Sequence, residues 1–336
     1  MTAPLDLDES ASHAAPETML AGEGKRIEGR SLGQIAWMRL KRDKVALISI
    51  GVVALFVLVA IIAPLLTKIV GTDTSTFYSG TYNPDDGVPK GLWHSGISLA
   101  HPLGVEPASG RDLFARVVYG SRVSLIVAFV ATLVTMVLGT VAGITAGFFG
   151  GWIDQAISRV MDTLLAFPQL LFIIAFTPVI NDRLVQLGFS DSTATREIVI
   201  IAILAIFAWP YIGRIIRGQT LSLREREFVD AARSLGASSG HIIFKQLLPN
   251  LVAPILVYAT LSIPTYVTLE AALSYLGVGV KQPTPSWGDS IGSAVPWALV
   301  DPMFLLVPSA FLLVLVLTFN LFGDGLRDAL DPKAGR

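Results

Sequence analysis

The chain has 336 residues, of which 52% are hydrophobic and 15% are charged, and its net charge is −1 at pH 7. A soluble domain usually carries about 25% charged residues, because its surface must be polar. The deficit of charge excludes an ordinary soluble domain, and the balanced charge excludes a strongly basic surface for nucleic acid. The chain has no cysteine, which excludes disulfides, thiolate metal sites, iron–sulfur clusters and cysteine nucleophiles.

The N-terminal part of the chain precedes any long apolar stretch. Residues 1–30 are acidic and rich in small residues, glycine and proline, which predicts a disordered cytoplasmic tail. Residues 31–44 mix apolar side chains with Arg39, Lys41 and Arg42, and this composition predicts a short interfacial helix at the membrane surface. The alternative is a simple juxtamembrane anchor.

Six apolar stretches without a charged residue follow along the chain. The first of them, Val45–Leu66, has 22 residues, and a helix needs about 20 apolar residues to cross a hydrocarbon core. Six such stretches argue against a soluble core, and their lack of alternation excludes the strands of a membrane β-barrel. We therefore predict an all-α integral membrane protein with six transmembrane helices. Their expected positions are residues 45–66, about 122–149, 156–180, 197–216, 248–272 and 302–323.

The basic residues predict the orientation, because cytoplasmic segments carry more lysine and arginine than segments on the other side. With a cytoplasmic N-terminus, 17 of the 25 basic residues lie on the cytoplasmic side. An even number of spans then places both the N- and the C-terminus in the cytoplasm. Residues 67–121 form an external loop, residues 217–247 a cytoplasmic loop, and residues 334–336 a short tail. A second external segment carries a predicted short helix at Trp287–Val300.

The cytoplasmic loop 217–247 is dense in charge and rich in helix-forming residues. Glycine weakens a helix and proline removes a backbone donor, so both mark helix boundaries. The sequence predicts a helix that breaks at Gly236, and a second short helix from Ser238 to Leu247 that stops at Pro249. Such a helical hairpin suits a groove in a partner protein. The alternative is a solvated loop that only carries the positive-inside charges.

The order of residues in this loop resembles the EAA loop of ABC-importer permeases. Two alanines follow Asp230, Gly236 comes six positions after the acid, and a Leu-Pro pair ends at Pro249. Asp230 stands where glutamate is usual in that family, which keeps the charge. In that family the glycine corner forms a coupling helix that sits in a cleft of the ATPase subunit. The resemblance implies an ATPase-coupling role for Asp230, Ala231, Ala232, Arg233, Leu235, Gly236, Ala237, His241, Ile242, Lys245 and Pro249.

Further motifs extend the resemblance to permeases of the dipeptide/oligopeptide DppC/OppC type, over about residues 31–333. These motifs include His101-Pro-Leu-Gly104, Gly110-Arg111-Asp112, Gly150-Gly151-Trp152, Ala166-Phe167-Pro168, Pro283-Thr284-Pro285-Ser286-Trp287-Gly288 and Asn320-Leu-Phe-Gly323-Asp324-Gly325. Each motif is short, but their order along the chain is specific. The resemblance implies the type I ABC-importer permease fold, with the permease core at residues 122–333.

The same resemblance implies an assembly around this chain. The expected partners are a second homologous permease subunit in a heterodimer, two ABC ATPase subunits, an extracytoplasmic solute-binding protein and the lipid bilayer, with no nucleic acid. The expected location is the bacterial cytoplasmic membrane. The expected function is that of the transmembrane permease subunit of an ATP-driven importer, which moves di- or oligopeptides by alternating access.

The chain shows no motif for catalysis of its own. It contains no Gly-x-x-x-x-Gly-Lys-Ser/Thr phosphate loop. Its four histidines are scattered, and no Ser-His-Asp pattern stands out. We therefore expect no catalytic residue, no metal ligand and no cofactor in this chain, with ATP and magnesium bound by the partner ATPase subunits.

Charged and aromatic positions near the spans supply further candidates. Glu270, near the outer end of the fifth span, and Trp287 are candidate contacts with the transport pathway or with a docked binding protein. The alternative for Glu270 is an interfacial charge. Arg159 and Asp162 are three positions apart, which predicts an ion pair on one helix face.

Other functions stay open on the sequence alone. Similar permeases import nickel complexes or another small solute on the same fold. An autonomous secondary transporter or channel would show inverted repeats, ion-binding residues at the midplane or a selectivity filter, and the spans show few central ionisable groups. A membrane scaffold without transport activity would leave uptake independent of this chain.

Overall fold

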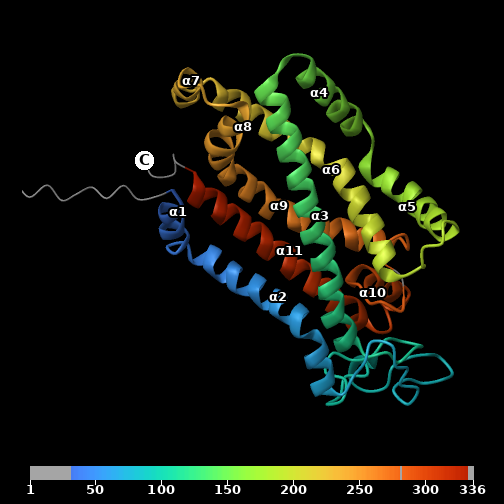
Figure 1. The fold of residues 1–336 in the computed structure, drawn as a ribbon. Helices are drawn as coiled ribbons and strands as arrows, with labels where there is room; N and C mark the ends of the chain where they lie inside the picture. The colour runs from blue at the N-terminus through green and yellow to red at the C-terminus, as the bar shows by residue number, and fades with distance from the viewer. Residues whose placement is uncertain (1–31, 281, 332–336) are drawn as a thin grey trace, which may run out of the picture.

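The computed structural model describes residues 32–280 and 282–331, and within these residues every regular element is helical (Figure 1). The predicted all-α class is therefore confirmed, whereas the predicted tails 1–30 and 334–336 lie outside the described residues. The helices are α1 (Leu32–Leu40), α2 (Lys44–Val70), α3 (Leu113–Phe149), α4 (Gly151–Ala166), α5 (Gln169–Gln186), α6 (Thr193–Arg224), α7 (Glu227–Ser234), α8 (Ser239–His241), α9 (Leu248–Tyr275), α10 (Trp287–Ala294) and α11 (Pro302–Leu330). Shorter turns of helix lie at Leu92–His94, Ile242–Leu247 and Val295–Trp297.

Five helices are long and apolar enough to cross a membrane, and a sixth span results if α4 and α5 count as one broken span. The helices α4 and α5 meet at a bend of 86°, so the predicted third span at 156–180 is not one continuous helix. The bend falls at Phe167 and Pro168, and Phe167 has an extended backbone with ψ of 135°. A proline lacks the amide hydrogen and disfavours the helical conformation in the residue before it, which explains the break.

Two helices are longer than the sequence predicted. α3 begins at Leu113 rather than at 122, because the Asp112 side chain accepts a hydrogen bond of 2.6 Å from the Ala115 amide and caps the helix. The external loop therefore ends at Asp112 rather than at 121. α6 continues to Arg224, so the first part of the predicted loop 217–247 is helical.

Glycine residues on α3 allow close packing against α6. Gly139, Gly143 and Gly147 are spaced four apart along α3. A Cβ atom on Gly143 would lie 2.6 Å from the carbonyl oxygen of Gly213, and one on Gly147 would lie 2.7 Å from Cβ of Thr220. Small residues at this spacing let two helix backbones approach closely inside a membrane. The packing of α3 on α6 thus fixes the end of α6, and with it the start of α7, which follows α6 in the chain.

The two ends of the described chain lie at the same end of the bundle (Figure 1). The α1 helix packs against the last turns of α11, where Nη1 of Arg39 donates a hydrogen bond of 2.6 Å to the carbonyl oxygen of Asp331. The α7–α8 region lies toward this end, whereas α10 and the loop 71–112 lie at the opposite end. The side of the membrane that each end faces stays a prediction.

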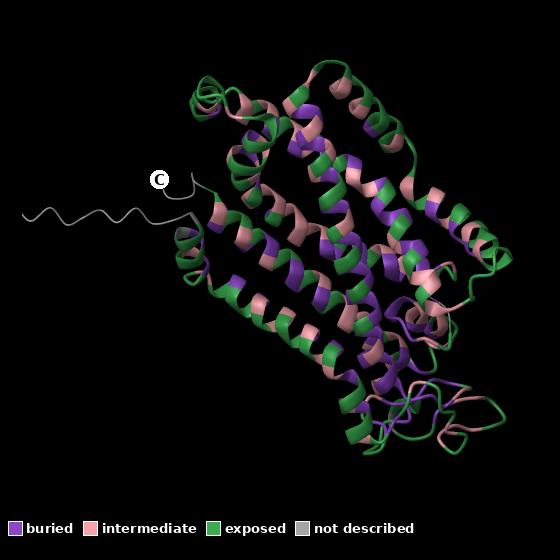
Figure 2. Cartoon of the chain, in the orientation of Figure 1, coloured by how far each residue is buried: buried purple, intermediate pink, exposed green. Residues whose placement is uncertain are grey.

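The outward face of α2 is exposed along the helix (Figure 2), and its side chains are mostly apolar. Ile48, Ile61 and Ile69 are each more than two-thirds exposed, at 68%, 69% and 72%. A contiguous exposed apolar face of this kind suits the hydrocarbon of a bilayer rather than water. The segment predicted as an interfacial helix, 31–44, contains α1 and leads directly into this face.

Candidate functional site

The chain between α6 and α9 folds into a helical hairpin, which we call the hairpin 227–247. It consists of α7, a turn at residues 235–238, α8 and a π-helix at Ile242–Leu247. Oγ of Ser238 accepts a hydrogen bond of 3.3 Å from the His241 amide, and so caps the second helix. The hairpin and its cap agree with the sequence prediction, and residues 227–247 are helical except for the turn at 235–238.

The turn of the hairpin depends on Gly236. Its φ of +81° lies in the left-handed region, which favours glycine. The Gly236 amide donates to the carbonyl oxygen of Arg233 at 2.9 Å, and the Ala237 amide donates to that of Ala232 at 3.0 Å. These hydrogen bonds satisfy carbonyl groups at the end of α7, as in a Schellman motif. No atom lies within 4 Å of a Cβ built on Gly236, so the backbone conformation alone restricts this position.

A small apolar core holds the two arms of the hairpin together. Val229 from α7 packs with Ile242 and Leu247 from the second arm, and all three side chains are buried. Phe148 at the end of α3 and Leu223 at the end of α6 pack against this core. The hairpin is therefore attached to the ends of two long helices and moves with them.

The tip of the hairpin exposes large apolar side chains. Leu235 is 87% exposed and Phe244 is 67% exposed. The two side chains flank the Gly236 turn, and Ala231 on α7 is exposed as well. An exposed apolar tip with charged neighbours is typical of a surface that a partner protein covers.

The predicted coupling residues fall into two groups. Ile242 is buried in the hairpin's own core, and Ala232 and Ala237 are half-buried. The exposed members are Asp230, Ala231, Arg233, Leu235, Gly236, His241, Lys245 and Pro249. The prediction that Pro249 stops the second helix is wrong, because the π-helix runs directly into α9 and Pro249 lies in the first turn of α9. A proline is tolerated there, since the amide of a first-turn residue is not needed within the helix.

Arginine side chains at the base of the hairpin form hydrogen bonds and ion pairs with α3 and α4. Nη1 of Arg224 donates a hydrogen bond of 2.8 Å to the carbonyl oxygen of Gly147. Arg217 binds both carboxylate oxygens of Asp154 on α4, at 2.5 and 2.7 Å. Bidentate pairs of this kind fix the geometry of both partners. The end of α6 is thereby joined to α3 and to α4.

Asp162 pairs with a different arginine from the one predicted. Its Oδ1 lies 2.5 Å from Nη2 of Arg214 on α6, so the predicted ion pair between Arg159 and Asp162 is wrong. Spacing alone favours an ion pair between side chains three positions apart on one helix. The packing of α4 on α6 instead brings the Arg214 side chain to Asp162. The sequence contained no signal for this pairing.

Glu270 and Trp287 are both fully buried within the chain. The Glu270 carboxylate accepts hydrogen bonds from Oγ of Ser124 at 2.6 Å and from Oγ of Ser274 at 2.8 Å. Nε1 of Trp287 donates to the carbonyl oxygen of Val117 at 2.9 Å. Glu270 is therefore not an interfacial charge. Neither side chain reaches the surface where a docked protein or a solute would touch it.

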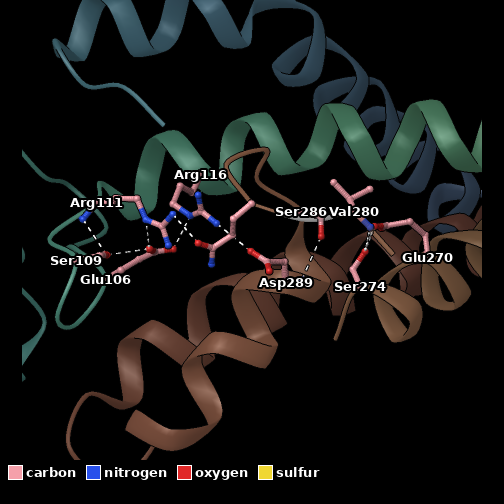
Figure 3. A network of polar contacts seen from close by, with 10 residues as sticks. Glu106, Ser109, Arg111, Arg116, Glu270, Ser274, Val280, Ser286 and Asp289 are labelled. Carbon is pink, nitrogen blue, oxygen red and sulfur yellow. Dashed lines mark hydrogen bonds and ion pairs between the residues drawn. The ribbon is translucent and has the colours of Figure 1, made fainter. Parts of the chain in front are cut away.

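A buried cluster of charges holds the loop 71–112 against the bundle (Figure 3). Glu106 pairs with Arg111 at 2.7 Å and with Arg116, and Arg116 also pairs with Asp289 of α10 at 3.1 Å. Burial raises the pKa of Asp289, while Arg116 opposes this shift. Arg111 completes the connection through Gln282 at 2.9 Å. The sequence did not predict this cluster, because Gln282 and Asp289 are far along the chain from Glu106, Arg111 and Arg116.

No group of three or more His, Asp and Glu side chains in residues 32–280 and 282–331 is arranged to hold a metal ion. The hairpin 227–247 is thus an exposed surface at one end of the bundle, and its base contacts the ends of α3 and α6.

Comparison with known families agrees with this arrangement. Residues 139–336 match the family described as the binding-protein-dependent transport system inner membrane component. Residues 31–86 match the N-terminal transmembrane domain of oligopeptide transport permease C. The MetNI methionine ABC transporter, in an inward-facing conformation, has a chain of similar fold, with a TM-score of 0.51 and 22% identity over 65% of this chain and 98% of that one. The class of protein is thus a membrane permease of binding-protein-dependent transport.

Curated relatives narrow this class. The chain is 39% identical to the dipeptide transport system permease protein DppC of Alkalihalophilus pseudofirmus over 298 residues, 89% of each chain. It is 34% identical to the oligopeptide transport system permease protein OppC of Bacillus subtilis over 320 residues, 95% of this chain and 96% of the relative. It is 35% identical to the glutathione transport system permease protein GsiD of Escherichia coli over 297 residues, 88% and 89%. The chain belongs to the DppC/OppC family of ABC transport permeases.

Proposed function

We propose that this chain is one of the two permease subunits of an ATP-driven importer, which carries di- or oligopeptides across the bacterial cytoplasmic membrane. Membership of the permease family supports the class of the protein. The names of the relatives support the class of solute, because a dipeptide, an oligopeptide and glutathione are all peptides. Nickel complexes or another small solute are the alternative cargo on this fold.

The proposed assembly places its partners at opposite ends of the bundle. A second, homologous permease completes the pathway as a heterodimer, and an extracytoplasmic solute-binding protein delivers the peptide at the end that carries α10. Two ATPase subunits bind at the end that carries α7, which we assign to the cytoplasm together with both termini. ATP and magnesium bind to the ATPase subunits, and this chain binds no cofactor and catalyses no reaction.

The observation that carries this proposal is the hairpin 227–247. It presents an exposed apolar tip, with Leu235 at 87% exposure, on a base that is buried against α3 and α6. A tip of this kind is suited to a groove in a partner. A rigid base lets a push on the tip reach the long helices instead of being absorbed by a flexible loop.

The mechanism is alternating access, in which packed helices rock as units between two arrangements. Closure of the ATPase subunits displaces the hairpin. The contacts of Arg224 with Gly147 and of Arg217 with Asp154 carry this displacement to α3 and α4. The spans then open the pathway to one side of the membrane and close it to the other.

The experiment is ATP-dependent uptake of a labelled dipeptide by the complete complex in proteoliposomes. The variants Ala231→Glu and Gly236→Glu place a charged side chain at the tip. We expect both variants to insert into the membrane normally and to lose most of the uptake. Gly71→Glu is the matched control. Gly71 has a φ of +79° and open space around its Cβ, but it follows the C-terminal end of α2, at the opposite end of the bundle from the hairpin.

Two results would reject the proposal. Normal uptake and normal ATPase stimulation in both tip variants would remove the coupling role from the hairpin. Gradient-driven flux by the purified chain alone, without its partners, would instead favour a secondary transporter or channel. Dependence of uptake on ATP, on the binding protein and on this chain supports the proposal.

A further inference from the structure

The helix α4 has a polar exposed surface, unlike the outward face of α2. Met161 is its sole buried residue, and Gln155, Arg159 and Asp162 are all exposed (Figure 2). Charged side chains in the hydrocarbon region are costly and usually face water or a partner. The polar part of this surface is therefore better suited to water or to a partner than to hydrocarbon, although α4 also exposes the apolar side chains of Val160 and Leu165.

A shallow, open depression lies on this surface, and we call it the α4 groove. It has a volume of about 540 Å³ and is lined by Trp152, Gln155, Ala156, Ser158, Arg159 and Asp162. A second groove of about 400 Å³ lies between α2 and α3 and has mostly apolar lining residues, such as Ile61 and Phe129. The α4 groove is thus distinct in its chemistry and is not a groove for an acyl chain.

The charges around the α4 groove leave one positive charge without a neutralising partner. Asp154 pairs with Arg217, and Asp162 pairs with Arg214. Arg159 lies between the two acids along α4, and among residues 32–280 and 282–331 its guanidinium forms no ion pair. A guanidinium with free donors binds a carboxylate through two parallel hydrogen bonds.

We propose that Arg159 binds the terminal carboxylate of the transported peptide as the peptide passes through the α4 groove. This inference rests on the proposed function. Every linear peptide carries this carboxylate whatever its side chains, so one arginine serves peptides of different sequence. The indole of Trp152, which is 77% exposed, lies in the same groove and offers an apolar surface to the neighbouring side chain of the peptide.

The position of the groove fixes the stage at which this contact forms. α4 begins at Gly151, directly after the end of α3 that contacts the hairpin. Arg159 therefore lies in the half of the bundle nearer the hairpin, and the peptide reaches it late in its passage. A weak contact between Arg159 and the peptide at that point orients the carboxylate of the peptide toward α4. Because the contact is weak, the peptide can still dissociate from it.

The test uses the complete complex in proteoliposomes and a dipeptide whose C-terminal residue is photo-leucine. We measure uptake, and we map the photolabelled peptide segments of this chain. The variants are Arg159→Gln and Arg159→Lys, and the control is Arg183→Gln, an exposed arginine on α5.

We expect the label on α4 in the wild type. Arg159→Gln should lower both labelling and uptake about tenfold, as for the loss of one charge-assisted hydrogen bond. Arg159→Lys should retain most of both, and Arg183→Gln should change neither.

Several results would overturn the assignment. Labelling elsewhere, or α4 labelling that Arg159→Gln leaves unchanged, would show that the peptide does not bind there. Failure of the Arg159→Gln chain to co-purify with the second permease would assign Arg159 to a subunit contact. An effect that disappears in liposomes without anionic phospholipid would assign it to a lipid headgroup. Absence of uptake by the wild-type complex would instead reject the proposed peptide transport itself.

Discussion

Arg224, the last residue of α6, donates a hydrogen bond of 2.8 Å from Nη1 to the main-chain oxygen of Gly147 near the end of α3. The bond satisfies one of the carbonyl groups that the last turn of a helix leaves without a partner. It also joins the base of the hairpin 227–247 to the helix that packs most closely on α6. In the proposed mechanism, the two residues lie on the route by which motion of the hairpin reaches the bundle.

Replacing Arg224 tests this route. The variant Arg224→Gln loses a charge-assisted hydrogen bond, which contributes about 1.5–3 kcal/mol, and the hairpin base should become looser. We expect ATP hydrolysis to continue while fewer peptides are imported per ATP hydrolysed. The measurement is the ratio of uptake to hydrolysis in proteoliposomes. Arg226→Gln, two positions further at the N-cap of α7, is the control, and an unchanged ratio in Arg224→Gln would show that this bond does not transmit the motion.

The close packing of α3 on α6 gives a second prediction. A Cβ on Gly143 would lie 2.6 Å from the carbonyl oxygen of Gly213, so Gly143→Ala must push the two backbones apart. Overpacking of this kind costs about 1–3 kcal/mol, and we expect a lower midpoint of unfolding in detergent. Gly51→Ala in α2 is the control, because no atom lies within 4 Å of its Cβ and alanine favours a helix. Equal midpoints for the two variants would contradict the packing described.

The Asp301 carboxyl predicts a dependence of stability on pH. Asp301 caps α11 through the Phe304 amide at 3.2 Å, and burial raises its pKa to about 6. The folded chain therefore holds this proton more tightly than the unfolded chain, for which the pKa is about 3.9. The free energy of unfolding should fall as the pH rises from about 4 to 6, by at most about 3 kcal/mol from this group.

Asp301→Asn isolates this contribution. Asparagine keeps a side-chain oxygen that can cap the helix, and it does not titrate. We expect the variant to lose the decrease in stability between pH 4 and pH 6 that Asp301 causes in the wild type. The measurement is chemical unfolding in detergent across this pH range. The same pH dependence in both proteins would assign it to other groups.

Local patterns in the sequence predicted much of the fold. Apolar stretches predicted the spans, because burial in a membrane requires long runs of apolar residues whatever their neighbours. The hairpin was predictable as well, since Gly236 and Ser238 act on their own backbone or on residues close in sequence. The break between α4 and α5 has its signal in Pro168, because a proline in a span often interrupts the helix, but the size of the bend is not readable from that residue.

Contacts between distant helices were not predictable in the same way. Asp162 pairs with Arg214 rather than with Arg159 because α4 packs on α6, and one sequence contains no record of that packing. Glu270 was a candidate contact with the pathway or a docked protein, with an interfacial charge as the alternative, yet its carboxylate accepts hydrogen bonds from Ser124 of α3 and Ser274 in the interior. The glycine spacing on α3 was a readable signal for close helix packing. It does not identify the partner helix, which the structure shows to be α6.

The central claim is that the hairpin 227–247 docks into an ATPase subunit. The chain contains no cysteine, so Leu235→Cys provides a single site for a thiol-attached photo-crosslinker at the tip of the hairpin. The control is Leu99→Cys, at a fully exposed position in the loop at the opposite end of the bundle. Both variants are studied in complexes whose partner chains lack cysteine. We predict that the crosslinker at 235 captures an ATPase subunit and that the one at 99 does not. Capture of an ATPase subunit from position 99, or its absence from position 235 in an intact complex, would contradict the account.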